Sequence, residues 1–190
     1  NGLGKKMVTW DDAFAFDPEK ATQATVMSWR GDAIAQIALD HGREVIAGPV
    51  FPTYLDYSQE VSESEPLAIG GPVTLADVLV FKPLAGVTGV QFQLWSEYIQ
   101  SPVHAEYMMW PRAAALAFRC WSEDQDFESY FNKRRPQLEA LGVTIREIDP
   151  AKRVNISHLG IGDYYRGFDT AQMMQALEKS AIAGEVAHDF

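Results

Sequence analysis

The chain has 190 residues, of which 47% are hydrophobic and 22% charged, and its formal net charge is −10 at pH 7. The length suffices for one domain with a substantial core, and no apolar run is long enough to span a membrane. The acidic excess argues against nucleic acid as a partner, because phosphate binding needs clustered lysine and arginine. The single cysteine, Cys120, excludes an internal disulfide, and we expect it to be a buried, inert thiol.

Hydrophobic periodicity predicts strands and helices in alternation along the chain. The expected strands are short apolar runs at residues 7–10, 24–28, 44–47 and 88–95. The expected helices are 32–41, a short helix starting at 74–77, one helix carrying Tyr107, Trp110, Ala114, Phe118 and Trp121, and 127–141. Gly42 and Gly142 stop two of these helices, and Pro136 is expected to kink or split the last one. This order of elements indicates an α/β fold.

Aromatic and acidic residues stand at or just after the ends of these strands. They are Trp10, Trp29, Tyr54, Asp56, Trp95 and Glu97. In a β/α barrel the reactive groups lie at the carboxyl ends of the strands. An indole ring covers the apolar face of a sugar and a carboxylate accepts hydrogen bonds from hydroxyl groups. The pattern therefore predicts a carbohydrate site.

Each of these residues also has an ordinary structural interpretation. Trp95 and Glu97 fit a core tryptophan and a solvated acid equally well, and Trp10 fits a plain strand end followed by solvated acids. Tyr54 and Asp56 fit a core tyrosine and a turn former. However, these two residues lie two positions apart on an extended segment, so their side chains would point the same way and could reach one ligand.

The remaining charged and histidine residues carry less information. Glu60, Glu63 and Glu65 are expected to form a solvated acidic patch in the long connection 58–87. Arg30 is expected to be a surface or loop-pairing arginine rather than a ligand contact. Three of the histidines share no spacing typical of ligands: His104, His158 and His188. We therefore expect no metal and no cofactor.

Four segments in consistent order resemble glycoside hydrolase family 20, the β-N-acetylhexosaminidases. They are the Trp-Asp of residues 10–11, VMSWRG, Tyr-Leu-Asp-Tyr at 54–57, and GVQFQLWSEYI with the following EYMMWPRAAALA. The resemblance implies the C-terminal part of a TIM (β/α)8 barrel, with its last strands and helices in residues 1–146. Residues 147–190 would be a C-terminal tail with one helix, from Asp169 to Ala183.

The resemblance also implies a role for each strand-end residue. Trp10 and Trp29 would wall the pocket for the acetamido group of the sugar, and Tyr54 would donate a hydrogen bond to the acetamido oxygen. Asp56 and Glu97 would hold sugar hydroxyls, and Trp95 would cover the sugar. Asp12 departs from the family pattern, because a glutamate usually stands at that place.

The implied reaction is retaining, substrate-assisted hydrolysis of terminal non-reducing N-acetylglucosamine or N-acetylgalactosamine. In that family an adjacent Asp-Glu pair supplies the general acid, and this sequence contains no aspartate directly followed by glutamate. We therefore expect a fragment, or a chain completed by a missing N-terminal barrel half, that is inactive alone. The alternative is a non-catalytic carbohydrate-binding half-barrel. The expected ligands are N-acetylhexosaminide glycans or chito-oligosaccharides, and the resemblance favours a secreted, periplasmic or lysosomal location.

Overall fold

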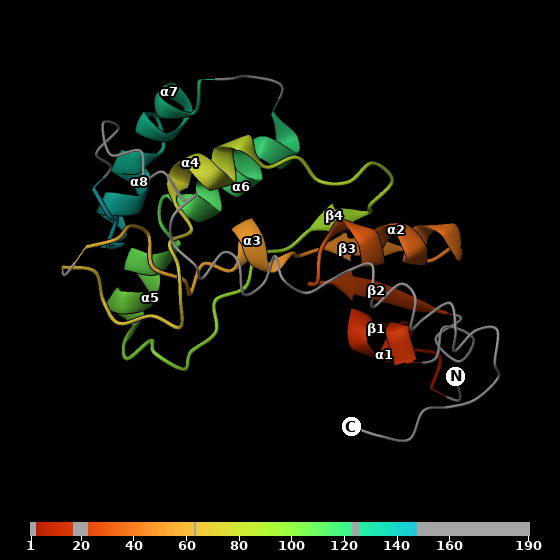
Figure 1. The fold of residues 1–190 in the computed structure, drawn as a ribbon. Helices are drawn as coiled ribbons and strands as arrows, with labels where there is room; N and C mark the ends of the chain where they lie inside the picture. The colour runs from red at the N-terminus through yellow and green to blue at the C-terminus, as the bar shows by residue number, and fades with distance from the viewer. Residues whose placement is uncertain (1–2, 17–22, 63, 123–125, 148–190) are drawn as a thin grey trace.

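The computed structural model describes residues 3–16, 23–62, 64–122 and 126–147. Strands and helices alternate in its first part, and helices alone make up the last (Figure 1). In chain order the elements are β1 (Met7–Trp10), α1 (Asp11–Phe16), β2 (Ala24–Ser28), α2 (Asp32–Asp40), β3 (Val45–Ala47), α3 (Val50–Thr53), α4 (Leu75–Val80), β4 (Gly89–Val90), α5 (Pro102–Met109), α6 (Arg112–Trp121), α7 (Phe127–Asn132) and α8 (Arg135–Ala140). The helix expected from Asp169 lies outside the described residues.

The four strands form one parallel sheet in the order β1-β2-β3-β4. The first three strands confirm the prediction almost residue for residue. Parallel neighbours need a crossover connection, and α1 and α2 supply it between β1, β2 and β3. Because all four strands are parallel, the residues that follow them lie at the same end of the sheet, its carboxyl end. Within the described residues the sheet is open, with β1 and β4 at its edges.

Helix α2 covers the sheet through a small apolar core. Its buried residues are Ile34, Ala35 and Ala38, and the last two pack with Phe14, Val26 and Val45. The helix ends one residue earlier than predicted, and Gly42 follows in a left-handed conformation with φ of 70°. Glycine adopts this conformation without the steric cost of a Cβ atom, so the predicted stop is confirmed.

The fourth strand is much shorter than the predicted 88–95. Regular pairing covers only Gly89 and Val90, because the neighbouring strand β3 ends at Ala47 and the chain then turns into α3. Pairing resumes at Gln93, whose amide donates to the carbonyl of Thr53 at 3.0 Å. The Gln93 side chain lies so close to Gly48 that a Cβ there would be 2.8 Å from Nε2. A glycine at this place lets the two segments approach.

The helix expected through Trp110 is broken into α5 and α6. Pro111 separates them because it has no backbone N–H to continue the hydrogen-bond ladder. Phe118 is buried as predicted, but Trp121 is 90% exposed at the last position of α6, so its predicted place on the apolar face is wrong. The closing helix splits into α7 and α8 just before Pro136, one of the two predicted outcomes.

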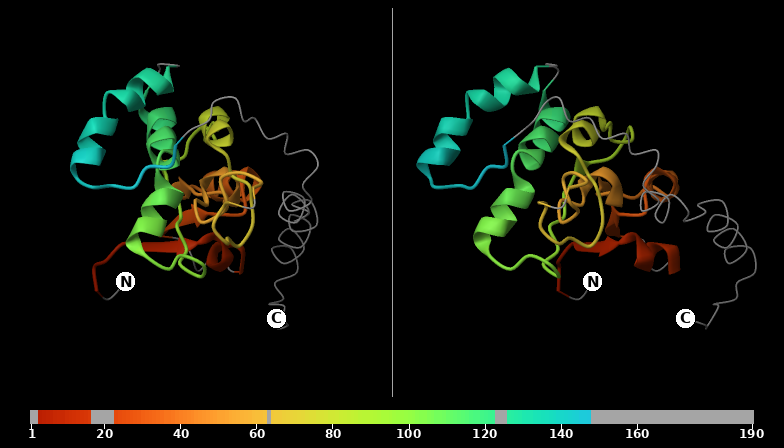
Figure 2. Two further views of the ribbon diagram at one scale, coloured as in Figure 1. Left: turned by 90° about the vertical axis from the view of Figure 1, so that its left-hand side faces the viewer. Right: turned by 60° about the vertical axis from the view of Figure 1, so that its left-hand side comes forward.

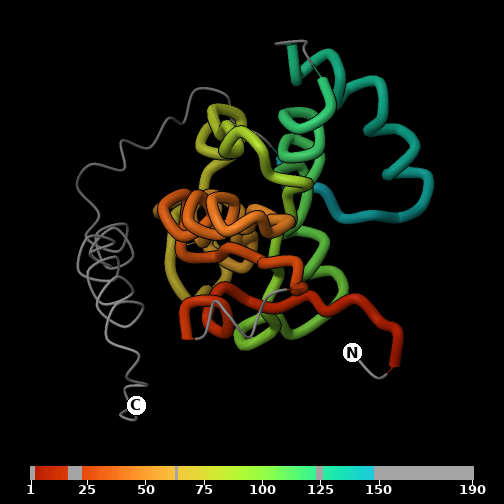
Figure 3. Tube along the Cα trace, turned by 90° about the vertical axis from the view of Figure 1, so that its right-hand side faces the viewer, coloured from red at the N-terminus to blue at the C-terminus, as the bar shows by residue number. Residues whose placement is uncertain are grey.

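Helices α4, α6 and α7 enclose the larger hydrophobic cluster. Its central aromatic contact joins Phe118 to Phe127 at 5.6 Å and to Tyr130 at 4.8 Å between ring centroids. Helix α4 begins where the sequence predicts a short helix, and the structure shows a Thr74–Asp77 capping box at its start. Figure 2 shows α5 and α6 end to end beside the sheet, and Figure 3 shows α7 and α8 on the far side of this column. None of the described helices is long and apolar enough to cross a membrane.

The predicted solvated acidic patch is wrong for the two of its members that the structure describes. The side chain of Glu65 is only 4% exposed and that of Glu60 14%, and both pair with Arg146 at 3.1 Å. Glu65 also accepts a hydrogen bond of 2.6 Å from the Tyr107 hydroxyl. The arginine and the phenol come from distant segments and compensate the buried charges, which a local acidic pattern cannot show.

Candidate active site

Three of the predicted aromatic residues meet at the carboxyl end of the sheet. Trp10 ends β1, Tyr54 follows α3, and Trp95 lies beyond β4. The rings of Trp10 and Trp95 have centroids 5.9 Å apart, and those of Tyr54 and Trp95 are 6.4 Å apart. Trp95 is 42% exposed, whereas Trp10 and Tyr54 are half-buried. The three rings therefore form one partly exposed aromatic cluster at this end of the sheet.

Asp56 lies next to this cluster as a buried carboxylate. It is only 5% exposed, and its Oδ1 atom has no hydrogen-bond partner among the described residues. Burial raises the pKa of Asp56 from 3.8 to about 6, backbone N–H donors including that of Trp95 oppose the rise, and the nearby charge of Glu97 adds to it. An unpaired buried oxygen of this kind can accept a hydrogen bond from a ligand hydroxyl. Glu97 itself is exposed.

Trp29 is fixed at the end of β2 by the two acids that follow β1. Its backbone N–H donates to Asp11 at 2.9 Å, and its indole Nε1 donates to Asp12 at 2.8 Å. Trp29 and Tyr54 both pack against the larger hydrophobic cluster. Arg30 pairs with Asp11 and Asp12, as expected of a loop-pairing arginine. Of the six predicted residues, Trp10 ends β1 and Trp29 directly follows β2. Tyr54 and Asp56 instead come after α3, and Trp95 and Glu97 come five and seven residues after the end of β4.

Arg112 was not singled out from the sequence, but it binds the backbone of the segment that carries Tyr54 and Asp56. It is completely buried and makes five hydrogen bonds of 2.6–3.2 Å to four backbone carbonyls. These acceptors are Met108, Leu55, Tyr57 and Val73. Burial lowers the pKa of Arg112 to about 9. Its place four residues before Leu116 on the apolar face of α6 is the one sequence signal that could have revealed it.

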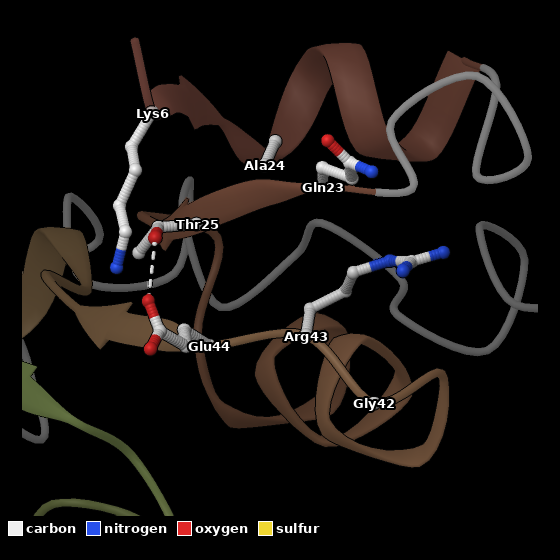
Figure 4. Close-up of a pocket in the computed structure, with 7 residues that line it drawn as sticks. All are labelled: Lys6, Gln23, Ala24, Thr25, Gly42, Arg43 and Glu44. Carbon is white, nitrogen blue, oxygen red and sulfur yellow. Dashed lines mark hydrogen bonds between the residues drawn. The ribbon is translucent and has the colours of Figure 1, made fainter. Parts of the chain in front are cut away.

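The described residues offer no cluster of histidine, cysteine, aspartate and glutamate that could hold a metal ion. Cys120 is half-buried, and burial raises the pKa of its thiol, which favours the protonated form. A polar cavity of about 320 Å³ lies at the opposite end of the sheet, where β2 and β3 begin (Figure 4). There Thr25 donates to Glu44 at 3.0 Å. In barrel proteins this end is associated with stability rather than chemistry.

A parallel sheet with helices between its strands, and with its aromatic and acidic cluster at their carboxyl ends, is typical of the β/α-barrel class of α/β proteins. The family model "Glycosyl hydrolase family 20, catalytic domain" matches residues 1–124. The chain therefore belongs to glycosyl hydrolase family 20, a family of glycosidases, which confirms the resemblance and the α/β fold.

Relatives and solved structures agree with this assignment. The chain is 34% identical over 129 residues to a β-hexosaminidase of Porphyromonas gingivalis and 33% identical over 127 residues to one of Vibrio furnissii. These matches cover 63% and 60% of this chain, and 16% and 20% of the relatives. A family 20 exo-β-N-acetylglucosaminidase of Vibrio harveyi, solved in complex with N-acetylglucosamine, superposes with a TM-score of 0.70 at 29% identity, over 80% of this chain and 26% of that one. The chain thus spans about a quarter or less of these proteins.

Proposed function

We propose that this chain forms the substrate pocket of a β-N-acetylhexosaminidase that removes terminal non-reducing N-acetylglucosamine or N-acetylgalactosamine. Its substrates would be N-acetylhexosaminide glycans or chito-oligosaccharides. The observation that carries the proposal is the meeting of Tyr54, Trp95 and the buried carboxylate of Asp56, whose Oδ1 atom has no partner among the described residues, at the carboxyl end of the sheet. Family membership supplies the reaction class.

In this proposal the aromatic rings bind and orient the sugar. Trp10 and Trp29 wall the acetamido pocket, and Trp95 covers the apolar face of the ring. Asp56 and Glu97 accept hydrogen bonds from sugar hydroxyls. These hydroxyl donors would reduce the electrostatic repulsion between the two carboxylates.

Tyr54 acts on the reacting group itself. The acetamido oxygen of the substrate attacks the anomeric carbon, the leaving oxygen takes a proton from a general acid, and a cyclic oxazolinium intermediate forms. Water then opens this ring, so the configuration is retained. The Tyr54 hydroxyl donates to the acetamido oxygen and holds it near the anomeric carbon, where proximity supplies much of the acceleration.

In this proposal the general acid lies in a part of the barrel outside this 190-residue chain. The sequence contains no Asp-Glu pair, and the sheet described here has four strands and two open edges. We propose that residues 1–146 are the C-terminal half of the catalytic barrel and that residues 147–190 form a tail. Further barrel strands would supply the acid and close the sheet.

The test uses the complete enzyme that carries this chain and a nitrophenyl N-acetyl-β-glucosaminide. We expect hydrolysis with the β-anomer as the first product by proton NMR, and negligible hydrolysis of the matching glucoside, which lacks the acetamido group. Equal hydrolysis of both substrates would contradict substrate assistance. Binding of N-acetylglucosamine without any turnover would favour the non-catalytic half-barrel instead.

A further inference from the structure

A network of five hydrogen bonds joins the end of β1 to the end of β2. Asp11 accepts from the backbone N–H groups of Trp29 and Arg30 at 2.9 and 3.1 Å, and from the Arg30 guanidinium at 2.5 Å. Asp12 accepts from the Trp29 indole at 2.8 Å and from the other terminal nitrogen of Arg30. The guanidinium carbon also lies 4.6 Å from the centroid of the Trp29 ring.

The two aspartates divide this work. Asp11 is completely buried and binds backbone, so it ties the two strand ends together. Asp12 is more than half exposed and binds only side chains, namely the indole edge and the guanidinium. The indole is thus held at its N–H by Asp12 and at its face by Arg30. Two contacts from different directions fix both the position and the tilt of a planar ring.

We infer that Asp12 and Arg30 are positioning residues that fix the Trp29 indole and thereby set the size of the N-acyl group that the pocket accepts. This inference rests on the proposed function, in which Trp29 walls the acetamido pocket. A wall held at two points rejects a longer acyl chain, whereas a wall free to tilt makes room for it. One extra methylene is typically discriminated by roughly 10- to 200-fold in such a pocket.

The variant Asp12→Ala removes the contact to the indole and one partner of Arg30, while Asp11 keeps the strand ends together. Asp12→Glu keeps the charge and lengthens the side chain by one methylene, and serves if the alanine variant does not fold. A matched control is Asp40→Ala, because Asp40 is also an exposed helix aspartate with one side-chain donor, Gln36 at 2.8 Å. Asp40 ends α2 at the other end of the strands.

The measurement is the ratio of kcat/KM for the N-acetyl and N-propionyl nitrophenyl glucosaminides, made with the complete enzyme. We expect this ratio to fall about tenfold in Asp12→Ala, as part of the discrimination of one methylene, and to change in Asp12→Glu as the ring is displaced. The ratio should stay at the wild-type value in Asp40→Ala. A wild-type ratio in Asp12→Ala overturns the inference, because a purely structural role would lower both rates equally.

A second readout separates this inference from the proposed function. The indole ¹⁵N–¹H resonance of Trp29, assigned from its loss in Trp29→Phe, should shift in Asp12→Ala and remain in place in Asp40→Ala. If the wild-type enzyme hydrolyses neither substrate, the proposed function fails and the resonance still tests the positioning. A Trp29 resonance unmoved in Asp12→Ala overturns the positioning role whatever the activity.

Discussion

At the scale of single residues, Tyr54 has the most direct predicted role. Its ring is held between Tyr57 and Trp95, with centroid distances of 6.4 Å to each. Tyr54→Phe keeps the ring and removes one donor to the acetamido oxygen. Because charge on that oxygen changes most in the transition state, we expect kcat to fall about a hundred- to a thousand-fold. Steady-state kinetics of the complete enzyme on one glucosaminide measures this.

The acid variants provide the comparison for Tyr54. Asp56→Asn and Glu97→Gln weaken contacts to hydroxyl groups that are present in both the ground and transition states, so much of their effect should fall on KM. If Tyr54→Phe turns over normally while the acid variants do not, the assigned role is wrong. Tyr57 would then be the next residue to test.

Asp56 makes a prediction about pH. Since its folded-state pKa is about 6, it is largely protonated below that pH and accepts hydrogen bonds poorly. We expect kcat/KM of the free enzyme to fall as the pH drops through about 6, and Asp56→Asn to lack this part of the profile. The pH dependence of kcat/KM for the wild type and the variant is the measurement.

Glu97 supplies the control for this assignment. Its negative charge raises the pKa of Asp56, so Glu97→Gln should move the same limb of the profile to lower pH. A limb of the kcat/KM profile that survives unchanged in Asp56→Asn would assign it to another group.

The raised pKa of Asp56 also affects stability. Asp56 favours folding most at low pH, and this contribution is lost as the pH rises through about 6.

At the scale of elements, Arg112 determines how α6 and the strand-end loop fit together. Its guanidinium joins the end of α5 to the segments that carry Leu55, Tyr57 and Val73. Arg112→Met fills the space but leaves four carbonyls without this donor, and each unsatisfied buried group costs about 1–3 kcal/mol. We expect a loss of stability of at least about 4 kcal/mol, read as a fall in the midpoint of thermal unfolding.

Arg112→Lys is the matched control, because it keeps the charge but offers fewer donors in a different geometry. It should be destabilised less than Arg112→Met and should retain part of the activity. Arg119, on the same helix and only partly buried, provides a second comparison in Arg119→Met. An Arg112→Met enzyme as stable as the wild type would show that these carbonyls find other partners.

At the scale of the whole molecule, the described sheet is exposed where a barrel would be closed. Met7 and Val8 of the edge strand β1 are 48% and 54% exposed. An open edge of this kind readily pairs with further strands, which supports the proposal that the chain forms part of a larger barrel.

We expect the 190-residue chain alone to show negligible hydrolysis of the nitrophenyl N-acetylglucosaminide. Without the general acid, the rate should lie at least about a hundred- to ten-thousand-fold below that of the complete enzyme. The comparison is made at equal concentrations of folded protein, judged by circular dichroism. Robust turnover by the chain alone would place the acid within it, and Asp11, Asp12 and Glu97 would become the residues to test.

The sequence alone determined the features that depend on neighbours along the chain. Apolar periodicity located the first three strands and α2, the sequence also placed the start of α4, and prolines and glycines marked several helix ends. The strand-end motifs indicated the family, because each motif is a short run of residues with a characteristic spacing. These signals are local, so they survive in the sequence without knowledge of the fold.

Only the tertiary structure decided the features that depend on distant partners. Arg112 can be buried because backbone carbonyls of Val73, Tyr57 and Leu55 accept its hydrogen bonds. These residues lie 39 to 57 positions away in the sequence, so no local pattern reveals them. Glu65 leaves solvent because Arg146, 81 positions further along, returns to it. The fourth strand stops early because its neighbour turns away. A charged side chain can be buried where a distant segment supplies its hydrogen-bond partners. A strand ends where the neighbouring strand no longer offers backbone groups to pair with.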